Sequence, residues 1–345
     1  MVPASLCVNS GRDYTVETPT TQEGIRHKEA PVQDKRITVL GIFVADLAFR
    51  TPQLPAWGQT VLGAEYRLGP GGKGSNQAVA AARLGGAVSL ICTVGRDPFG
   101  ELARSTWRAA GIDTEFCADA PADAPDAATG AAAIVVHPVT GENAIVAVPG
   151  ASSLLGVADV DRAASRIAAS AVFVTQLELP LAVAAHGLRL AHAAGVPTIL
   201  NAAPAVPLPG DLYGCCDYVT PNESEAAALT GQPVETPEDA ARAADILLAR
   251  GCRNVVITLG GRGALAKSGA VTAHVPACDA GPVVETTGAG DAFTGALAIA
   301  LAEGLDLVAA TRFGCAAAGI SVTRHGTARA MPTRAEVEGL LARTR

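Results

Sequence analysis

A glycine-rich turn near the C-terminus places one acid beside several backbone amides. It reads Glu285-Thr-Thr-Gly-Ala-Gly-Asp-Ala-Phe-Thr-Gly-Ala-Leu297, and its acid is Asp291. Glycine tolerates the positive φ angles that let consecutive amides converge, so the N–H groups of Gly288, Ala289 and Gly290 are candidates for an anion hole. If a helix begins at about Asp291, its unpaired N–H groups and dipole add to the attraction for a phosphate. The turn therefore predicts a base beside a phosphate site, although a plain helix N-cap would also explain the acid.

A second glycine-rich segment lies near residue 72. It reads Gly71-Gly-Lys-Gly-Ser-Asn-Gln-Ala-Val-Ala-Ala-Ala-Arg-Leu-Gly-Gly86, a loop followed by a helix whose alanines permit close packing. The pattern G-x-G-x-x-G occurs here, but the stretch before it is a poor first strand for a dinucleotide fold, and no Ser or Thr follows Lys73 as a Walker A loop requires. These features disfavour a Rossmann dehydrogenase and a P-loop enzyme. What remains is a loop whose backbone and Asn76 amide can approach a polar ligand closely.

Composition favours a globular protein that acts on small soluble ligands. The chain has 345 residues, 49% of them apolar, which is ample for a substantial core. Its net charge of −7 argues against a nucleic-acid partner or an anionic membrane surface, since either needs clustered Lys and Arg.

Cysteine and histidine usage favours a reduced, cytoplasmic protein without a zinc site. The eight cysteines contain no C-x-x-C pair, and most lie in apolar runs, so we expect reduced packing residues. The six histidines show no metal-binding spacing. We find neither a signal-peptide pattern nor an apolar run long enough to span a membrane.

The order of apolar and polar segments predicts an α/β fold. Residues 1–35 are polar and are expected to form a disordered tail before an apolar strand at 37–44. Further strands are predicted at 87–94, 171–177, 196–203, 217–220 and 254–259, and helices at 75–84, 99–110, 181–194 and 238–250. Apolar strands with intervening helices indicate a mostly parallel sheet covered on both faces, with ligands at the carboxyl ends of the strands.

Two stretches break this alternation. Residues 47–69 lack helical periodicity, and residues 129–149 are typical of a hairpin, with strands at 131–136 and 143–148 around a turn at Thr140-Gly141. Both are candidates for a small β-lid over the sheet edge. Plain surface loops are the alternative.

Together the two glycine-rich segments resemble the paired signatures of the PfkB carbohydrate kinases, the ribokinase superfamily. The resemblance extends from about Ile37 to the C-terminus. Four further strings share it: Gln176-Leu-Glu178, Asn201-Ala-Ala-Pro204, Pro221-Asn-Glu-Ser-Glu225 and Ile257-Thr-Leu-Gly260. It implies a three-layer sandwich at residues 36–345, with a central mostly parallel sheet between helices and a small β-sheet lid. It also implies transfer of phosphate from ATP, with Mg²⁺, to the exocyclic primary hydroxyl of ribose or a related furanose.

The resemblance assigns the reaction to the C-terminal turn. Asp291 would accept the proton of the attacking hydroxyl, a step that contributes roughly 10²- to 10⁴-fold in rate. The amides of Gly288, Ala289 and Gly290 would stabilise charge on the transferred phosphoryl group.

On the nucleotide side, Asn222 and Glu225 match an Asn-x-x-Glu element that places phosphate and Mg²⁺. Water is expected between Glu225 and Mg²⁺, which sheds its hydration reluctantly. An ordinary helix start would also explain these two residues. The positions that match ATP contacts are Asn222, Thr258, Gly260, Gly263, Gly290 and Cys315, the last replacing a His that often flanks adenine.

On the sugar side, the positions that match substrate contacts are Asp46, Gly72, Lys73, Asn76, Glu178 and Asp291. Asp46 is predicted to end the first strand, where its oxygens can accept bonds from vicinal hydroxyls. A strand-end turn residue and a surface loop lysine are the alternatives for Asp46 and Lys73.

Two departures from the family pattern affect substrate and cation. Val44 stands where ribokinases carry an Asn two residues before the substrate aspartate, so the substrate is ribose held by other groups, or something less hydroxylated or bulkier. A monovalent-cation site like the K⁺ site of ribokinases would use Glu285, Thr287, Ser321, Arg324 and Gly326. Glu285 replaces the usual Asp there, and Ala330 replaces a serine, which weakens the expected K⁺ dependence.

Several alternatives stay open. The same chemistry would serve a nucleoside kinase or another sugar or sugar-acid kinase. Phe49, Trp57 and Tyr66 could stack on a base, or they could equally pack in a dimer interface or a core. A non-catalytic sugar or nucleotide sensor is the alternative from another class, but it would not need Asp291. The resemblance also suggests a homodimer joined through the lids.

Overall fold

The computed structural model describes residues 35–139 and 142–344. The predicted tail, apart from Lys35, and the predicted turn at Thr140-Gly141 lie outside this range. The strands are β1 (Ile37–Leu40), β2 (Val44–Arg50), β3 (Glu65–Gly71), β4 (Val88–Val94), β5 (Asp113–Asp119), β6 (Thr129–Val136), β7 (Asn143–Gly150), β8 (Val172–Thr175), β9 (Thr198–Leu200), β10 (Tyr218–Val219), β11 (Asn254–Thr258), β12 (Ala264–Ser268) and β13 (Thr272–Val275). The helices are α1 (Lys73–Arg83), α2 (Pro98–Ala109), α3 (Val157–Arg162), α4 (Ala164–Ala168), α5 (Leu181–Ala193), α6 (Glu223–Thr230), α7 (Pro237–Ala249), α8 (Ala289–Ala302), α9 (Leu307–Ser321) and α10 (Arg334–Arg343).

The main sheet has the strand order β13-β12-β11-β10-β9-β8-β1-β4-β5. The seven strands from β11 across the sheet to β5 run parallel to one another. Strands β12 and β13 are added as antiparallel strands at the other edge, beside β11. The predicted mostly parallel sheet is thus confirmed. Its parallel strands end at one edge, so the residues that follow them gather there.

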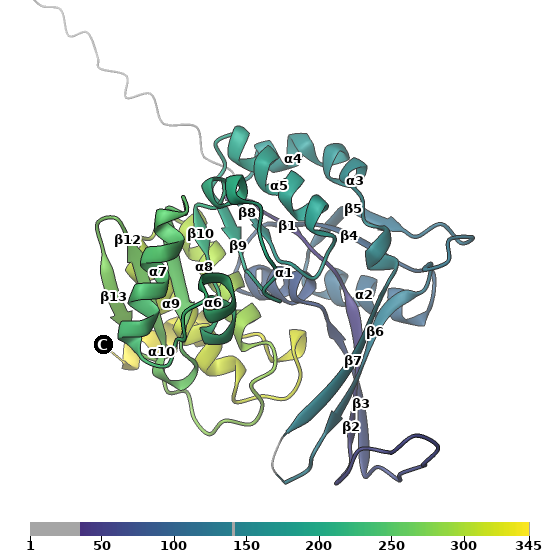
Figure 1. Cartoon of the computed structure of the whole chain (residues 1–345). Helices are drawn as coiled ribbons and strands as arrows, with labels where there is room; N and C mark the ends of the chain where they lie inside the picture. The colour runs from purple at the N-terminus through teal and green to yellow at the C-terminus, as the bar shows by residue number, and fades with distance from the viewer. Residues whose placement is uncertain (1–34, 140–141, 345) are drawn as a thin grey trace, which may run out of the picture. The chain divides into compact units, whose positions relative to one another are not determined.

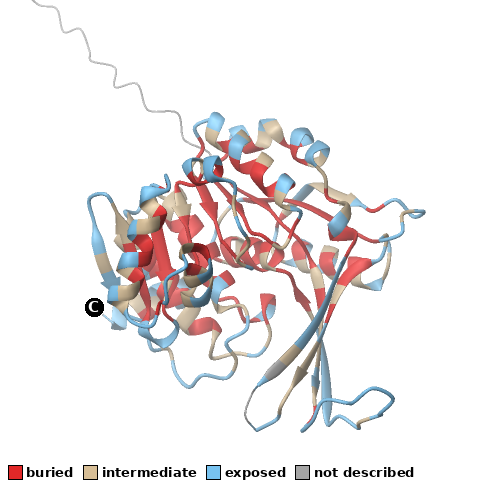
Figure 2. Cartoon of the chain, viewed as in Figure 1, coloured by how far each residue is buried: buried red, intermediate tan, exposed pale blue. Residues whose placement is uncertain are grey.

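Helices cover both faces of this sheet, and each face has its own apolar core (Figures 1 and 2). Successive side chains of a strand point to opposite faces, and accordingly Val39 packs in one core while Leu40 packs in the other. One core includes residues of α1, α2, α8, α9 and α10, and the other residues of α3, α4, α5, α6 and α7. This arrangement confirms the predicted three-layer sandwich.

The two stretches predicted as a lid form a separate four-stranded sheet in the order β3-β2-β6-β7. Figure 1 shows these strands projecting away from the main sheet as a twisted β-sheet. The predicted hairpin is the antiparallel pair β6–β7, and β2 pairs with both β3 and β6. Both stretches therefore contribute strands to a second sheet, while residues 51–64, between β2 and β3, form a mostly exposed loop.

The predicted first strand at 37–44 is wrong in one respect. It divides into β1, in the main sheet, and β2, which starts at Val44 in the second sheet. The break falls at Gly41, where an added Cβ would lie 2.6 Å from the Cα of Gly74. Asp46 is consequently the third residue of β2, and it does not end the first strand of the main sheet.

Close helix packing brings the two glycine-rich segments together. A Cβ on Gly295 of α8 would lie 2.6 Å from the Cβ of Ala80 in α1. Helix α8 begins at Ala289, two residues earlier than predicted, and Gly288 is its N-cap in the left-handed conformation with φ 81°.

Candidate active site

Residues that directly follow four neighbouring strands form the floor of the site. Gly41 follows β1, Gln176 follows β8, Asn201 follows β9 and Thr220 follows β10, and these strands are adjacent in the main sheet. The polar side chains at this edge connect to helices α1 and α8, which carry the two glycine-rich segments.

Asp291 lies at the meeting point of the two predicted halves. Its side chain is 5% exposed, and it is the third residue of α8. Asn76 Nδ2 donates to its Oδ2 at 2.9 Å, and Gln77 Nε2 donates to its Oδ1 at 3.0 Å. The plain N-cap alternative is therefore excluded, because Gly288 occupies the cap and the Asp291 carboxylate bonds side chains of α1.

Charges around Asp291 are arranged as one cation among several acids. Burial raises the pKa of Asp291, while the Lys73 ammonium and the Asn76 and Gln77 amides oppose that rise. Burial acts to lower the pKa of Lys73, but the carboxylates of Asp291, Glu178 and Glu225 together raise it. Lys73 is thus a charged, half-buried group facing the site, which argues against a plain surface lysine.

The two acids predicted to bind the sugar are held by backbone and hydroxyl groups. Glu178 Oε2 accepts from the backbone N–H of Lys73 at 2.8 Å. Burial raises the pKa of Asp46 to about 7, against a hydrogen bond from Thr327 Oγ1 to its Oδ2 at 3.4 Å. A Cβ on Gly71 would collide with the Asp46 carboxylate, so that glycine makes room for the acid. Val44 precedes Asp46 by two residues in β2 and shares its face of the strand.

Gly72 has a structural reason of its own. Its φ is +83°, and an added Cβ would lie 2.6 Å from the carbonyl oxygen of Ile42. The chain at this point therefore requires glycine whatever ligand it contacts.

Asn222 and Glu225 form a reciprocal capping box at the start of α6. Glu225 N–H donates to Asn222 Oδ1 at 2.9 Å, and Asn222 N–H donates to Glu225 Oε2 at 2.9 Å. The helix-start alternative is thus correct as a description of their local structure. Burial raises the pKa of Glu225, and Lys73 opposes that rise. An isolated bridge pairs Asn222 with Thr258, so the two predicted nucleotide positions are neighbours.

The glycines of the predicted nucleotide loop differ in what surrounds them. Nothing lies within 4 Å of the position that a Cβ on Gly260 or Gly290 would take. A Cβ on Gly263 would instead collide with the carbonyl oxygen of Val275, so its lack of a side chain serves backbone packing. Cys315 of α9 is 5% exposed and packs in the apolar core, and burial raises the pKa of its thiol to about 12.

The three amides predicted as an anion hole are not equivalent. Ala289 N–H donates to the carbonyl oxygen of Thr286 at 3.2 Å. For Gly288 and Gly290, no acceptor is recorded among residues 35–139 and 142–344. Gly290 is also exposed, so its amide is open to a ligand.

The segments predicted to hold a monovalent cation lie side by side. Val284 and Glu285 N–H both donate to the carbonyl oxygen of Val322, at 2.7 and 3.1 Å. The Glu285 carboxylate accepts from Gly326 N–H at 3.1 Å and lies 3.4 Å from His325 Nδ1. The remaining predicted positions have these surroundings: Thr287 is exposed, Ser321 is 3% exposed, Ala330 is 1% exposed, and the Arg324 guanidinium pairs with Glu336.

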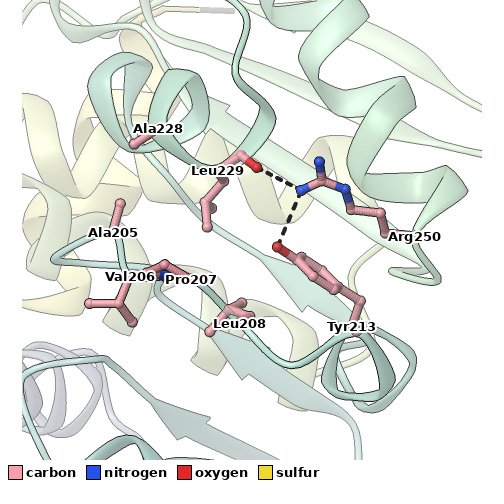
Figure 3. Close-up of a pocket in the computed structure, with 9 residues that line it drawn as sticks. Ala205, Val206, Pro207, Leu208, Tyr213, Ala228, Leu229 and Arg250 are labelled. Atoms are coloured by element: carbon pink, nitrogen blue, oxygen red, sulfur yellow. Dashed lines mark hydrogen bonds between the residues drawn. The ribbon is translucent and has the colours of Figure 1, made fainter.

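A hollow of about 830 Å³, lined by both charged and apolar residues, extends from Asp46 between the second sheet and the loops at 283–287 and 325–329. Another hollow, of about 540 Å³, lies against the end of α6 at Ala228 and Leu229 and against the loop at 205–208 (Figure 3). Its walls are mostly apolar, and its Arg250 guanidinium donates to Tyr213 and to the Leu229 carbonyl. It contains none of the residues predicted for the site. The hollow beside Asp46 is lined by the predicted residues Asp46, Glu285, Thr287 and Gly326, whereas Asp291 is not among its lining residues.

Three functional candidates escaped sequence reasoning: Gln77, Gln176 and Asn201. All three lie in segments that carry the resemblance, but nothing in the sequence indicates that their amides meet behind Asp291. In the described part of the chain, no three His, Cys, Asp or Glu side chains group as a metal site. None of its helices is long and apolar enough to cross a membrane.

Comparison with known proteins identifies the family. A model of the pfkB family of carbohydrate kinases matches residues 34–334. The chain belongs to this family. This pfkB-family kinase is 41% identical over 306 residues to the ribokinase of Mus musculus, and the match covers 87% of this chain and 93% of that protein.

Two further comparisons bear on fold and substrate. The pfkB-family kinase is 36% identical over 298 residues to a deoxyribokinase of Salmonella typhimurium, covering 86% of this chain and 95% of that one. It superimposes with a TM-score of 0.82 on Arabidopsis thaliana ribokinase complexed with ribose and ATP, at 29% identity, covering 89% and 98% of the two chains. The predicted fold and the predicted carbohydrate kinase activity are both confirmed.

Proposed function

We propose that this kinase transfers the γ-phosphate of ATP to the exocyclic primary hydroxyl of a ribose-like furanose, with Asp291 as general base. The observation that carries the proposal is the position of Asp291. It is a buried carboxylate held by two amide donors, and it lies in the first turn of α8 beside the open amide of Gly290.

Each step of the reaction falls to residues of this chain. Asp46, Glu178 and Asn76 orient the sugar, and the hydroxyl proton passes to Asp291 as its oxygen attacks phosphorus. Asn76 Oδ1 supports this role, because it is a buried acceptor that has no partner among the described residues. A sugar hydroxyl would satisfy it. The amides of Gly288 and Gly290, with the Lys73 ammonium, balance charge on the transferred group.

Mg²⁺ and a monovalent cation belong to the proposal as follows. Mg²⁺ would neutralise charge on the phosphates, and Glu225 would hold the ion through water. One carboxylate oxygen of Glu225 caps α6, while the other has no hydrogen-bond partner in the described part of the chain. The residues around Glu285 fit K⁺ less well. The Glu285 carboxylate and the Val322 carbonyl are already hydrogen-bonded there.

A second candidate substrate is 2-deoxyribose. Val44 lies on the same face of β2 as Asp46 and can bond no hydroxyl. A site with an apolar side chain there does not lose a hydrogen bond when the substrate lacks the hydroxyl. The relative from Salmonella typhimurium, named deoxyribokinase, is consistent with this candidate.

We also propose a homodimer formed through the second sheet. Its edge strands β3 and β7 are unpaired within the described chain, and its exposed apolar residues are Phe49, Tyr66, Leu68, Ile145, Val146 and Val148. Sedimentation of the full chain would test this.

The test of function is turnover of ATP with a panel of acceptors: ribose, 2-deoxyribose, fructose, 2-keto-3-deoxygluconate, adenosine and pseudouridine. We expect a pentose to have the highest kcat/KM. A preference for a nucleoside or a sugar acid would replace the proposed substrate. Binding of sugar without any turnover would point to a sensor and contradict the kinase proposal.

A further inference from the structure

Three amide side chains lie behind Asp291, and in the proposed reaction none of them contacts the sugar or ATP. Gln77, Gln176 and Asn201 are 1%, 0% and 6% exposed. Gln77 Nε2 donates both to Asp291 Oδ1 and to Asn201 Oδ1, each at 3.0 Å. Gln77 Oε1 accepts from Gln176 Nε2 at 2.6 Å. Both hydrogens and the oxygen of the Gln77 amide are therefore engaged.

The orientation of these amides is anchored at a backbone carbonyl. Asn201 Nδ2 donates to the carbonyl oxygen of Thr220 at 2.7 Å, and that oxygen can only accept. The Oδ1 atom of Asn201 must therefore face Gln77, and the NH₂ group of Gln77 must donate to it. The Asp291 carboxylate, also an acceptor only, requires the same orientation independently. Since the two ends agree, a flipped Gln77 amide would lose bonds at both.

Packing holds the far end of this chain of amides as well. The Gln176 side chain lies against Gly41 and Gly74. A Cβ on Gly41 would collide with Gln176 Oε1, and a Cβ on Gly74 would lie 2.9 Å from it. Glycine at both positions is what leaves room for Gln176, whose amide in turn fixes Gln77.

We infer that Gln77 is a positioning residue that orients the Asp291 carboxylate from the floor of the site, through the chain Asp291–Gln77–Asn201–Thr220. It fixes Oδ1 and thereby sets the direction of Oδ2, the oxygen that Asn76 contacts on the sugar side. The inference rests on the proposed function, because it assigns a role in that reaction.

The pH dependence expected for this role follows from the charges around Asp291. Lys73 of α1 favours its ionised form, while Glu178 after β8, Glu225 of α6 and Asp46 of β2 disfavour it. Hydrogen bonds from Asn76 and Gln77 also favour the carboxylate. Removing the Gln77 donor raises the pKa of Asp291, so the acid limb of the kcat profile moves to higher pH.

The test compares Gln77→Met with Thr175→Val. Methionine keeps the length of the side chain and removes its donors. Thr175 is a matched control, since it is fully buried one residue before Gln176 and its Oγ1 has no partner among the described residues. For Gln77→Met we expect kcat about 10- to 100-fold lower, KM for sugar and ATP within about 3-fold, and an acid limb about one pH unit higher. Thr175→Val should match the wild type in all three.

A second variant and a second readout guard against misfolding and inactivity. Gln77→Glu keeps the shape but opposes Asp291 with a second acid, so its acid limb should move further than that of Gln77→Met. Carboxyl ¹³C NMR of aspartate-labelled protein measures the pKa of Asp291 without turnover. A Gln77→Met protein with the wild-type pKa and kcat would overturn the inference. Failure of the wild type to phosphorylate any sugar would overturn the proposed function instead, while a raised Asp291 pKa in the variant would still support the positioning role.

Discussion

Gly295 of α8 packs directly on Ala80 of α1, with room for no side chain between them: an added Cβ would lie 2.6 Å from the Cβ of Ala80 and 2.6 Å from the carbonyl oxygen of Gln77. This contact sets the distance between the two glycine-rich segments, and hence between the amides of α1 and Asp291. Helix spacing and catalytic geometry are therefore coupled at one glycine.

Gly295→Ala is expected to lower the free energy of unfolding by about 1–3 kcal/mol and to reduce kcat, because overpacking separates α1 from α8. Urea denaturation and initial rates measure the two effects. Gly339→Ala is the matched control. It is also a mid-helix glycine, in α10, but its nearest neighbour is the flexible end of Arg343 at 3.7 Å. This control should gain up to about 1 kcal/mol from helix propensity. Equal losses in both variants would contradict the packing argument.

Asp291→Asn is expected to reduce kcat by about 10²- to 10⁴-fold, since an amide cannot accept the hydroxyl proton. Affinities for ATP and sugar should stay within a few-fold, because the asparagine keeps the size of the side chain. Calorimetric titration and steady-state rates separate these quantities. Substantial residual turnover would show that another group takes the proton.

Much of the site could be predicted because its residues are local in sequence. The turn at Gly288, the loop at Gly72 and the acid Asp291 are each visible in a short segment, and the alternation of strands and helices indicates where they meet. The amides behind Asp291 could not be predicted in the same way. Gln77 and Asn201 are 124 residues apart, and only the packed sheet brings them into contact.

The errors have physical causes of the same kind. The strand predicted at 37–44 is interrupted because Gly41 lies against Gly74, a contact that no local pattern reports. Gly263 stays a predicted nucleotide contact, and the sequence does not show that the backbone of β13 also requires a glycine there. The capping box of Asn222 and Glu225, in contrast, depends only on local spacing and is therefore visible in the sequence itself.

The pH dependence of sugar binding should follow Asp46. Its folded pKa is about 7, above the ordinary value of 3.8, so it loses its charge as the pH falls through about 7. We expect KM for the sugar to rise between pH 8 and pH 6, because the neutral acid is a weaker acceptor. The stability effect has the opposite sign. Since the folded state holds the proton more tightly than the unfolded state, the free energy of unfolding should rise as the pH falls from about 7 toward about 4. In Asp46→Asn, KM for the sugar and the free energy of unfolding should both depend less on pH. If both keep the wild-type pH dependence, a group other than Asp46 is responsible.

Glu225→Gln separates the capping role from the metal role. Glutamine can still accept from Asn222 N–H, so the melting temperature should change by only a few degrees. Loss of the charge should raise the Mg²⁺ concentration for half-maximal activity by about 10-fold or more. Rates measured against Mg²⁺ at fixed ATP provide this value. An unchanged Mg²⁺ requirement would leave Glu225 as a cap alone.

Val44→Asn tests what the apolar side chain beside Asp46 does to substrate choice. An asparagine on that face of β2 offers a donor and an acceptor for a sugar hydroxyl, whereas valine offers neither. The ratio of kcat/KM for ribose to that for 2-deoxyribose should therefore rise by about 10-fold or more, as a hydrogen bond to a hydroxyl contributes about 1–3 kcal/mol of discrimination. Val44→Leu is the control, since it changes volume without adding a polar group and should leave this ratio unchanged. If both variants shift the ratio equally, volume at this position and not hydrogen bonding decides between the two sugars.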